Sequence, residues 1–285
     1  MTQVQPSRKR TTFRIERLSP NIGAILHDID LREGLDNGTR DAVYQALLDH
    51  GVIFFRDQDI STEQHLAFSR LFGGLEVHPF ANHKTGFPEV IEIHHNETSK
   101  RGQNLWHSDV TWRQEPSLGS VLRALQVPDV GGDTLWANME LAYVSLDDEI
   151  KEKIDDLTAI HDFVPFRIGL RKRGASEAEI EEFNKNYPIA EHPVVRTHPD
   201  TGRKSLYVNC AFTIGIKDMA DEQAQPLLEM LYRQAAIPDY QCRFKWQPNS
   251  IAFWDNRATQ HYAAFDYHPA VRNMERVTIA GDRPF

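Results

Sequence analysis

The sequence predicts a single α+β domain, rich in β-strands, with a β-barrel or sandwich core and helices packed outside it. Short runs of β-branched and aromatic residues recur from residue 90 onward, and helical patterns separate them. This arrangement is typical of a β core that carries its helices on the outside. No internal repeat and no linker rich in Pro, Gly and Ser interrupts the chain. We therefore expect one domain over residues 1–285, with residues 1–12 as a flexible tail.

Three elements are expected near the N-terminus. Residues 39–50 place apolar side chains at helical spacing and are followed by Gly51, which favours a helix that ends there. The apolar run at residues 52–55 predicts a buried strand. Ser61 and Gln64 form a capping-box pattern ahead of further apolar residues, and this predicts a second helix.

Strands and helices alternate along the rest of the chain. From residue 90 onward the pattern is strand-like, and helical segments lie between the strands. Strands are expected at 90–93, 119–125, 134–137, 194–195, 205–208, 251–254 and 277–280, and helices at 148–157, 176–183 and 221–234.

The overall composition excludes several classes of protein. With 40% hydrophobic and 26% charged residues, the chain lies in the ordinary globular range. A net charge of -9 argues against a nucleic-acid-binding surface. The two cysteines, Cys210 and Cys242, are too few for a disulfide framework, so reduced thiols are expected. Neither a signal peptide nor an apolar membrane span is apparent, and we expect a soluble, cytoplasmic protein without membrane contact.

A pattern for metal binding occurs at His107 and Asp109. In an extended strand, residues two apart point to the same face, so one imidazole and one carboxylate could share a metal. The pair alone is a weak signal and needs a third ligand. His261 follows a buried strand and lies in a segment rich in polar groups that could support a metal ligand. Two histidines and one carboxylate form a facial triad, which leaves positions open for a chelating co-substrate and dioxygen on iron(II).

Other interpretations of these residues remain open at this point. His107 could be a histidine of the surface or of the core, and Asp109 a turn or cap residue. Most of the 13 histidines must have roles other than metal binding.

A possible anchor for a dicarboxylate lies further along the chain. Arg272 and Arg276 are four residues apart, so in a strand both side chains face the same way. Two buried positive charges are costly unless an anion lies between them, and 2-oxoglutarate would present its distal carboxylate to such a pair. Thr134 offers a hydroxyl for the same carboxylate. The alternative is two surface arginines on an exposed strand face.

These motifs resemble those of the taurine dioxygenase family, the taurine/2,4-dichlorophenoxyacetate dioxygenases. The resemblance extends from about residue 22 to the C-terminus, and its matching stretches are 106–111, 131–136, 192–199, 254–262 and 272–281. It implies a double-stranded β-helix (jelly-roll) core with flanking helices. It also implies a homodimer or homotetramer.

The resemblance also implies roles for individual residues. Iron(II) would be bound by His107, Asp109 and His261. 2-Oxoglutarate would be held by Thr134 and Arg276, with Arg272 nearby.

For the substrate, the resemblance implies that His78 reaches an anionic head group, helped by the backbone amide of Val110 and by Arg276. Phe212 would line the pocket, and Gln103 would occupy the position that contacts an amine.

The chain departs from the taurine-specific pattern at three positions. Ala81 stands in place of a tyrosine, Gln103 in place of an asparagine, and Arg167 in place of an aromatic wall. A different or larger anion than taurine is therefore expected.

The function expected from the sequence is that of an oxidoreductase, an iron(II)- and 2-oxoglutarate-dependent dioxygenase, with ascorbate as a supporting reductant. It would use dioxygen to hydroxylate a sulfonate, an alkyl sulfate ester or an aryloxyalkanoate, with fragmentation to an aldehyde or ketone and sulfite, sulfate or a phenol. Two alternatives are a zinc-dependent hydrolase with the same ligands and a non-catalytic jelly-roll binding protein. The first would not explain Thr134, Arg272 and Arg276 as an anchor, and the second has little reason to keep an open-sided triad.

Overall fold

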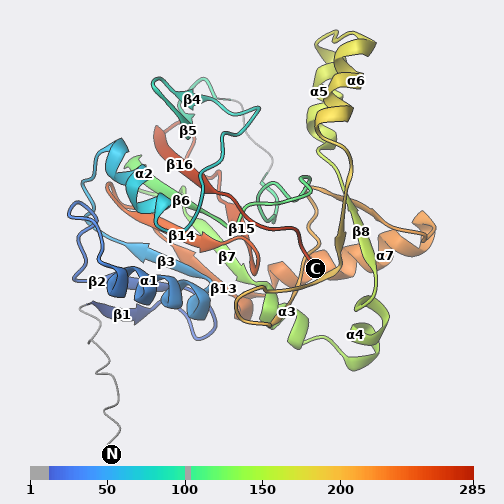
Figure 1. Ribbon diagram of the computed structural model, residues 1–285, viewed down its shortest axis with the longest axis horizontal. Coiled ribbons are helices and arrows are strands. Elements are labelled where there is room, and N and C mark those ends of the chain that lie inside the picture. Colours follow the sequence, from blue (N-terminus) through green and yellow to red (C-terminus); the bar gives the residue numbers. More distant parts are fainter. Residues whose placement is uncertain (1–12, 100–103) are drawn as a thin grey trace, which may run out of the picture.

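The computed structural model describes residues 13–99 and 104–285 and consists of mixed helices and mostly antiparallel sheets. The expected tail, residues 1–12, lies outside the described residues. The largest sheet has eight strands in the order β1-β2-β3-β14-β6-β16-β5-β4 (Figure 1). In chain order these strands are β1 (Arg14–Arg17), β2 (Ala24–His27), β3 (Val52–Phe55), β4 (His83–Lys84), β5 (Phe87–His95), β6 (Gly119–Gln126), β14 (Ile251–Asp255) and β16 (Arg272–Ile279).

A three-stranded sheet packs against one face of the large sheet. It contains β7 (Thr134–Asn138), β13 (Gln241–Phe244) and β15 (Thr259–Ala263) in the order β13-β7-β15. The Phe54 ring of β3 stacks on Phe244 at 4.0 Å between centroids and meets Trp136 edge-on at 5.2 Å. One hydrophobic core therefore lies between the two sheets, and β7 and β15 are held against β14.

Helices α1 (Asn37–His50) and α2 (Thr62–Arg70) cover the other face of the large sheet (Figure 1). Successive side chains of a strand point to opposite faces. In β3, Ile53 and Phe55 accordingly pack beneath the helices, whereas Phe54 faces the smaller sheet. This explains why all four residues of β3 are buried and why the run lacks polar alternation.

The remaining elements lie at the other end of the molecule. Two small sheets have the strand orders β12-β8-β9 and β10-β11. Their strands are β8 (Thr158–His161), β9 (Ala190–Pro193), β10 (Val195–Thr197), β11 (Lys204–Leu206) and β12 (Thr213–Ile216), accompanied by α3 (Met139–Val144), α4 (Asp148–Ile154), α7 (Asp221–Tyr232) and the 3₁₀ turns Arg233–Ala236 and Pro238–Tyr240.

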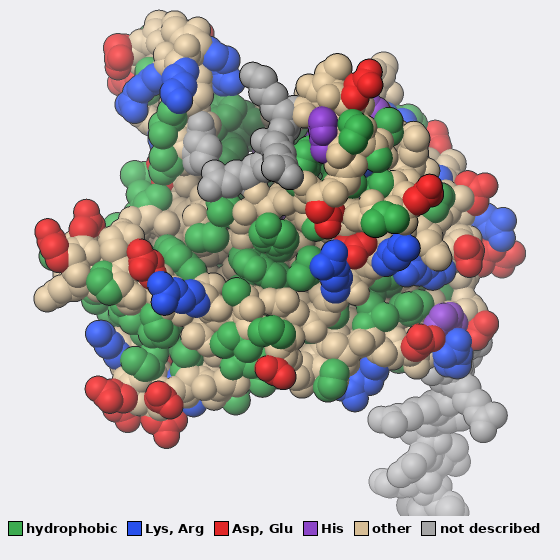
Figure 2. All heavy atoms as spheres, turned by 180° about the vertical axis from the view of Figure 1, so that it is seen from behind, with side chains coloured by type: hydrophobic (Ala, Val, Ile, Leu, Met, Phe, Trp, Pro, Cys, Tyr) green, Lys and Arg blue, Asp and Glu red, His purple; other side chains and the backbone are tan. Residues whose placement is uncertain are grey.

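Helices α5 (Val164–Lys172) and α6 (Glu177–Asn186) form a hairpin that projects from the body (Figure 1). Seen from behind, the hairpin stands out at the upper left, with Lys and Arg side chains gathered on it (Figure 2). Within the described ranges, no helix combines the length and apolar character needed to cross a membrane.

Most of the expected elements are confirmed, with shifted ends. The capping box is present, since Gln64 N donates to Ser61 Oγ at 3.2 Å and Ser61 N donates to Gln64 Oε1 at 2.7 Å. Helices α3 and α5 and strands β1, β2, β4, β8, β9, β12, β13 and β15 have no counterpart in the sequence prediction. Strand β15 is short and largely polar, and its pairing with β7 rather than its own pattern holds it extended.

A buried ion network fixes the segment between β14 and β15. Arg257 donates to both carboxylate oxygens of Asp255, from Nε at 2.8 Å and from Nη2 at 2.7 Å. His198 Nε2 lies 2.9 Å from the same carboxylate, and Arg257 also reaches Asp200 at 2.7 Å. Burial alone would raise the pKa of Asp255, but Arg257 outweighs it and holds this pKa well below its usual range.

We predict that acid destabilises the protein in part through Asp255. Its folded-state pKa lies below the unfolded value of about 3.9, so its stabilising contribution is complete above that value and is lost as the pH falls further. Urea unfolding at pH 6, 4 and 3 should show a smaller acid-induced loss of unfolding free energy in Asp255→Asn than in the original chain. Equal losses in the two proteins would contradict the prediction.

A second prediction concerns Gly119, at the start of β6. A Cβ added there would lie 2.3 Å from the Trp254 carbonyl oxygen, which is backbone and has little freedom to move. Gly119→Ala should therefore lower the unfolding free energy by about 3 kcal/mol or more, as measured in urea. Gly74→Ala is the matched control, because an added Cβ there meets no atom within 4 Å. A similar loss in both variants would show that close packing at Gly119 is not the cause.

Candidate metal centre and active site

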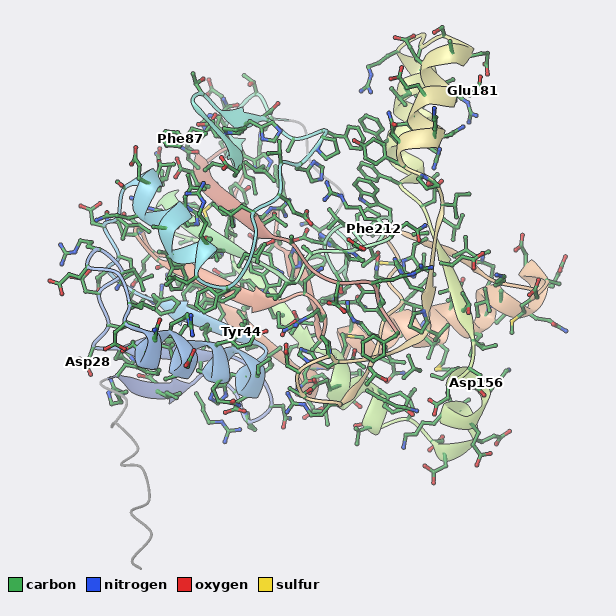
Figure 3. The ribbon with its side chains drawn as sticks, viewed as in Figure 1. Asp28, Tyr44, Phe87, Asp156, Glu181 and Phe212 are labelled. Atoms are coloured by element: carbon green, nitrogen blue, oxygen red, sulfur yellow. The ribbon has the colours of Figure 1, made fainter. Side chains whose placement is uncertain are left out.

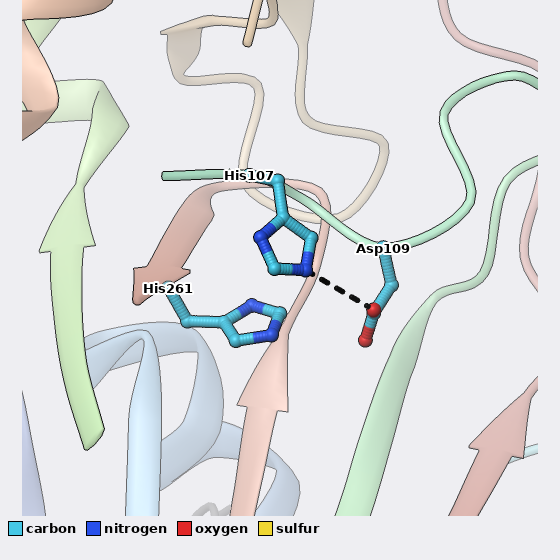
Figure 4. A group of neighbouring side chains, drawn as sticks. All are labelled: His107, Asp109 and His261. Carbon is cyan, nitrogen blue, oxygen red and sulfur yellow. Dashed lines mark ion pairs between the residues drawn. The ribbon is translucent and has the colours of Figure 1, made fainter. Parts of the chain in front are cut away.

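Three side chains converge on one point from two distant segments of the chain. His107, Asp109 and His261 each offer a ligand atom, and these atoms lie within 4.8 Å of one another. Figure 4 shows the three side chains facing a common space, with His107 Nε2 3.8 Å from Asp109 Oδ1. Among the described residues, no other group of His, Cys, Asp and Glu meets this criterion for a metal site.

The two segments are joined directly through their backbones. His107 N donates to His261 O at 3.2 Å, and His261 N donates to His107 O at 2.8 Å. This exchange is an isolated antiparallel bridge at the edge of β15. The two imidazoles therefore lie side by side, with their ring centroids 4.2 Å apart.

The expectation that His107 and Asp109 share a face of one extended strand is wrong. His107 belongs to the bridge, but Asp109 already lies in a turn. The next residue, Val110, has a φ of 50°, in the left-handed region that β-branched residues rarely occupy. The carboxylate reaches the metal position because the chain turns there, and not through strand alternation.

The Asp109 carboxylate is buried and ionised. Arg276 Nη1 donates to Oδ1 at 2.9 Å, and Ser120 Oγ donates to Oδ2 at 3.3 Å. Burial alone would raise the pKa of this carboxyl, but the positive charge of Arg276 counters burial and helps to keep the pKa well below its usual range. A charged oxygen ligand is therefore available at neutral pH.

Both imidazoles can serve as neutral ligands. His107 Nδ1 lies 2.9 Å from Leu105 O, so it carries the proton and leaves Nε2 free to bind a metal. Burial, reinforced by His107, lowers the pKa of His261 to about 3. Two neutral imidazoles and one carboxylate suit iron(II), and they fit the facial arrangement that this metal uses in oxygenases.

A cavity of about 240 Å³ opens beside the two histidines and extends to Thr134, Arg272 and Arg276. Arg272 is only 5% exposed, and within the described part of the chain no carboxylate pairs with it. Its guanidinium lies 6.0 Å from the ring centroids of both Trp246 and Tyr267. Burial lowers the pKa of Arg272, because a charge in this position is poorly solvated. An anionic ligand would offset this cost.

Thr134 shares a partner with Arg272. Trp246 Nε1 donates to Thr134 Oγ1 at 3.0 Å, while the Trp246 ring lies beside the Arg272 guanidinium. The hydroxyl proton of Thr134 is therefore free to point into the cavity.

Arg276 occupies a different part of the site, although it lies on the same strand, as expected. It pairs with Asp109, and its charge also acts on His78. Burial, followed by Arg276, lowers the pKa of His78 to about 4, so His78 is neutral near pH 7.

Two further expected pocket residues lie next to the metal ligands. The Phe212 ring is 6.1 Å from the His107 ring, edge to face, and Figure 3 shows Phe212 at the centre of the molecule, beneath the helical hairpin. The amide of Val110 donates to no protein acceptor in residues 13–99 and 104–285.

The three departures from the taurine pattern have different outcomes. Gln103 lies outside the described residues. Ala81 is in the loop that precedes β4. Arg167 donates to Asp162 at 2.7 Å and to the Tyr187 carbonyl at 2.9 Å, so it ties the base of the hairpin together. An aromatic ring on this side comes from Phe163, 5.7 Å from Phe212.

Several site residues are absent from the sequence prediction. His95 and Tyr267 line the cavity, with His95 Nδ1 2.7 Å from the Tyr267 hydroxyl. His95 could have been found only from sheet register, because it pairs with Arg272 across β5 and β16. No sequence pattern pointed to Trp246 as a site residue. Asn256, whose Oδ1 accepts a hydrogen bond from Asp109 N at 2.6 Å, lies within the motif 254–262.

Comparisons with known proteins agree with this geometry. The family model for the taurine catabolism dioxygenase TauD, TfdA family matches residues 14–278. An alkylsulfatase from Acinetobacter baylyi is 34% identical over 276 residues, which cover 95% of this chain and 86% of the relative. An alpha-ketoglutarate-dependent sulfate ester dioxygenase from Pseudomonas putida is 33% identical over 277 residues, covering 95% of this chain and 90% of the relative.

A solved structure shows the same fold. The crystal structure of a taurine dioxygenase from Burkholderia xenovorans has a TM-score of 0.83 and 37% identity, and the match covers 96% of this chain and 92% of that one. The family match, the identities over nearly the whole chain and the two-histidine, one-carboxylate group lead to one conclusion. The chain belongs to the TauD/TfdA family and is an iron(II)- and 2-oxoglutarate-dependent dioxygenase.

Proposed function

We propose that the protein hydroxylates a small organic anion, with sulfate esters favoured over sulfonates and aryloxyalkanoates. Hydroxylation of the carbon that bears the ester oxygen would give an unstable adduct that collapses to an aldehyde or ketone and releases sulfate; a sulfonate would release sulfite, and an aryloxyalkanoate a phenol. The observation that carries the proposal is Arg272, a buried cation without a carboxylate partner in the described chain, in the cavity that also holds His107 and His261. The named activities of the Acinetobacter and Pseudomonas relatives favour sulfate esters.

The metal would be held by His107, Asp109 and His261. Iron(II) bound there couples the oxidative decarboxylation of 2-oxoglutarate by dioxygen to hydroxylation of the substrate. The protein's own contribution is to orient the ligands, to keep Asp109 ionised through Arg276 and to expose one C–H bond of the substrate to the metal.

Arg272 and Thr134 would hold the distal carboxylate of 2-oxoglutarate. Both line the cavity and both contact Trp246, so a carboxylate could accept from the guanidinium and the hydroxyl together. Arg276 belongs to the same cavity but is already paired with Asp109. Its part in binding 2-oxoglutarate would therefore be secondary.

His78, Arg276 and the Val110 amide would receive the anionic head of the substrate. Phe80 N donates to His78 Nδ1 at 3.2 Å, so in the neutral ring the proton is on Nε2, which can donate to an anion. The Val110 amide has no protein acceptor in the described chain, and Arg276 supplies the positive charge. Phe212 and Phe163 would contact the apolar tail. Gln103 would contact the substrate, as the resemblance implies.

We extend the proposal to the architecture. The large sheet and the β13-β7-β15 sheet would form the two halves of a double-stranded β-helix, or jelly roll, in a single domain. The free thiols of Cys210 and Cys242 are consistent with the cytoplasm, and a homodimer or homotetramer is the expected assembly.

The first test of the proposed function is turnover. Purified protein with iron(II), 2-oxoglutarate, ascorbate and air should form succinate, with the largest stimulation by alkyl sulfates in a panel that also contains sulfonates and aryloxyalkanoates. Sulfate and aldehyde should appear in equal amounts with the succinate. Zinc in place of iron should give no turnover. Zinc-dependent hydrolysis, or no succinate with any member of the panel, would refute the proposal.

The second test separates the two arginines. Arg272→Ala should raise the KM for 2-oxoglutarate by about 10- to 100-fold, because a charge-assisted hydrogen bond of about 1.5–3 kcal/mol is lost. Arg276→Ala should act mainly on the KM of the substrate. Manganese(II) titration should show that Arg272→Ala still binds metal, and Arg272→Lys is the matched control for charge. If only Arg276→Ala raised the KM for 2-oxoglutarate, then Arg276 would be the anchor instead.

A further inference from the structure

A buried amide side chain holds the backbone of the metal-binding turn. Asn256 is 0% exposed, and its Oδ1 accepts from Asp109 N at 2.6 Å. Its Nδ2 donates to Asp109 O at 2.9 Å and to the carbonyl and hydroxyl oxygens of Ser117, each at 3.2 Å. The side-chain amide of Asn256 therefore forms hydrogen bonds with both the backbone N–H and the backbone carbonyl of Asp109, and further hydrogen bonds to Ser117 fix its own position.

The backbone of Asn256 is fixed as well. Asn256 N donates to Leu118 O at 2.9 Å, directly before β6, and Asp255 N donates to Gly51 O at 2.8 Å. The Asn256 side chain and its bonds to Asp109, here called the clamp, are therefore anchored to the large sheet through segments next to β3 and β6. Any movement of Asp109 along the chain direction would break at least one of its hydrogen bonds to Asn256.

The clamp also determines the direction of the next amide. Asp109 O and Val110 N belong to the same peptide unit, which is planar and trans, so the N–H points opposite to the carbonyl. Because Asn256 holds the carbonyl, the Val110 N–H points away from Asn256. The strained φ of 50° at Val110 costs on the order of 1–3 kcal/mol, and it persists only where the surroundings hold it.

We propose that Asn256 is a positioning residue for the reaction. With one side chain it fixes the carboxylate that binds the metal and the amide that receives the substrate's anionic group. The second half of this statement rests on the proposed function, because it takes the Val110 amide as an anion contact. The first half requires only that Asp109 binds a metal.

The test uses Asn256→Ala and the nearly isosteric Asn256→Asp, which keeps an acceptor for Asp109 N but loses both donors. The manganese(II) dissociation constant, measured without co-substrate, and the substrate KM should each rise by about 10- to 100-fold. Thermal melting reports the accompanying loss of stability. If Asn256→Ala does not fold, Asn256→Asp provides the same readings.

Gln58→Ala is the matched control. Gln58 is also buried, accepts from Leu31 N at 2.9 Å and donates to Ile29 O at 3.0 Å and Arg56 O at 2.8 Å, but it lies away from the metal group. Gln58→Ala should lower the melting temperature about as much as Asn256→Ala does, since each lost hydrogen bond costs on the order of 1 kcal/mol at either site. Its metal affinity and substrate KM should stay within about twofold of the values of the original chain. If Asn256→Ala behaved like Gln58→Ala, the positioning role would be refuted.

A rescue experiment isolates the backbone effect at Val110. Glycine adopts a positive φ without strain, whereas alanine does not. In the Asn256→Ala background, the raised substrate KM should therefore fall part of the way back toward the original value when Val110→Gly is added. Adding Val110→Ala should leave the raised KM unchanged. Equal KM values for the two double variants would refute control of the amide by Asn256.

The two proposals fail in different ways. An inactive original chain would refute the proposed function, while the manganese(II) titration of Asn256→Ala would still test the clamp. An active original chain whose metal affinity and KM do not change in either Asn256 variant would refute only the inference about Asn256.

Discussion

The active site depends on the backbone hydrogen bonds exchanged between His107 and His261. These two bonds join the segment around His107, which belongs to no regular strand, to the edge of β15. They bring together side chains from the middle and the end of the chain. The strand β15 is in turn held by β7, which packs against the large sheet through the aromatic core around Phe54. The position of the two histidines therefore depends on the contact between the two sheets.

Charge compensation explains much of the remaining site. Asp109 stays ionised in a buried position because Arg276 pairs with it, and burial lowers the pKa of His261 because it disfavours the charged form of that imidazole. Arg272 lacks such a partner in the described chain, and an unpaired buried cation is costly. The cavity thus contains an uncompensated positive charge, which a carboxylate of a dicarboxylate co-substrate is suited to neutralise. Binding energy of this kind can be used to position the reacting groups.

The surroundings of the metal differ on their two sides. On one side, β16 and β7 contribute Arg272 and Thr134, both held by sheet pairing. On the other side, Phe212 and Phe163 come from irregular segments at the base of the helical hairpin, where Arg167 ties the chain together. Groups on regular strands suit a co-substrate that does not vary. Groups on loops and on a projecting hairpin can change with the substrate at little cost to the core.

Local patterns in the sequence predicted the helix at 39–50, the helix after the Ser61 and Gln64 capping box and the strand at 52–55, because spacing, capping and residue type act over short distances. They also singled out His107, Asp109 and His261, which the structure brings together. The pairing of Arg272 and Arg276 on one strand was also predictable for this reason. Tertiary structure alone decided the rest. Asp109 sits in a turn because Asn256 holds it, and β15 is a strand because β7 pairs with it. Arg272 and Arg276 line one cavity, but only Arg276 has a carboxylate partner in the described chain because Asp109 pairs with it. Each of these contacts joins residues far apart in the chain, and no local pattern encodes their distance in space.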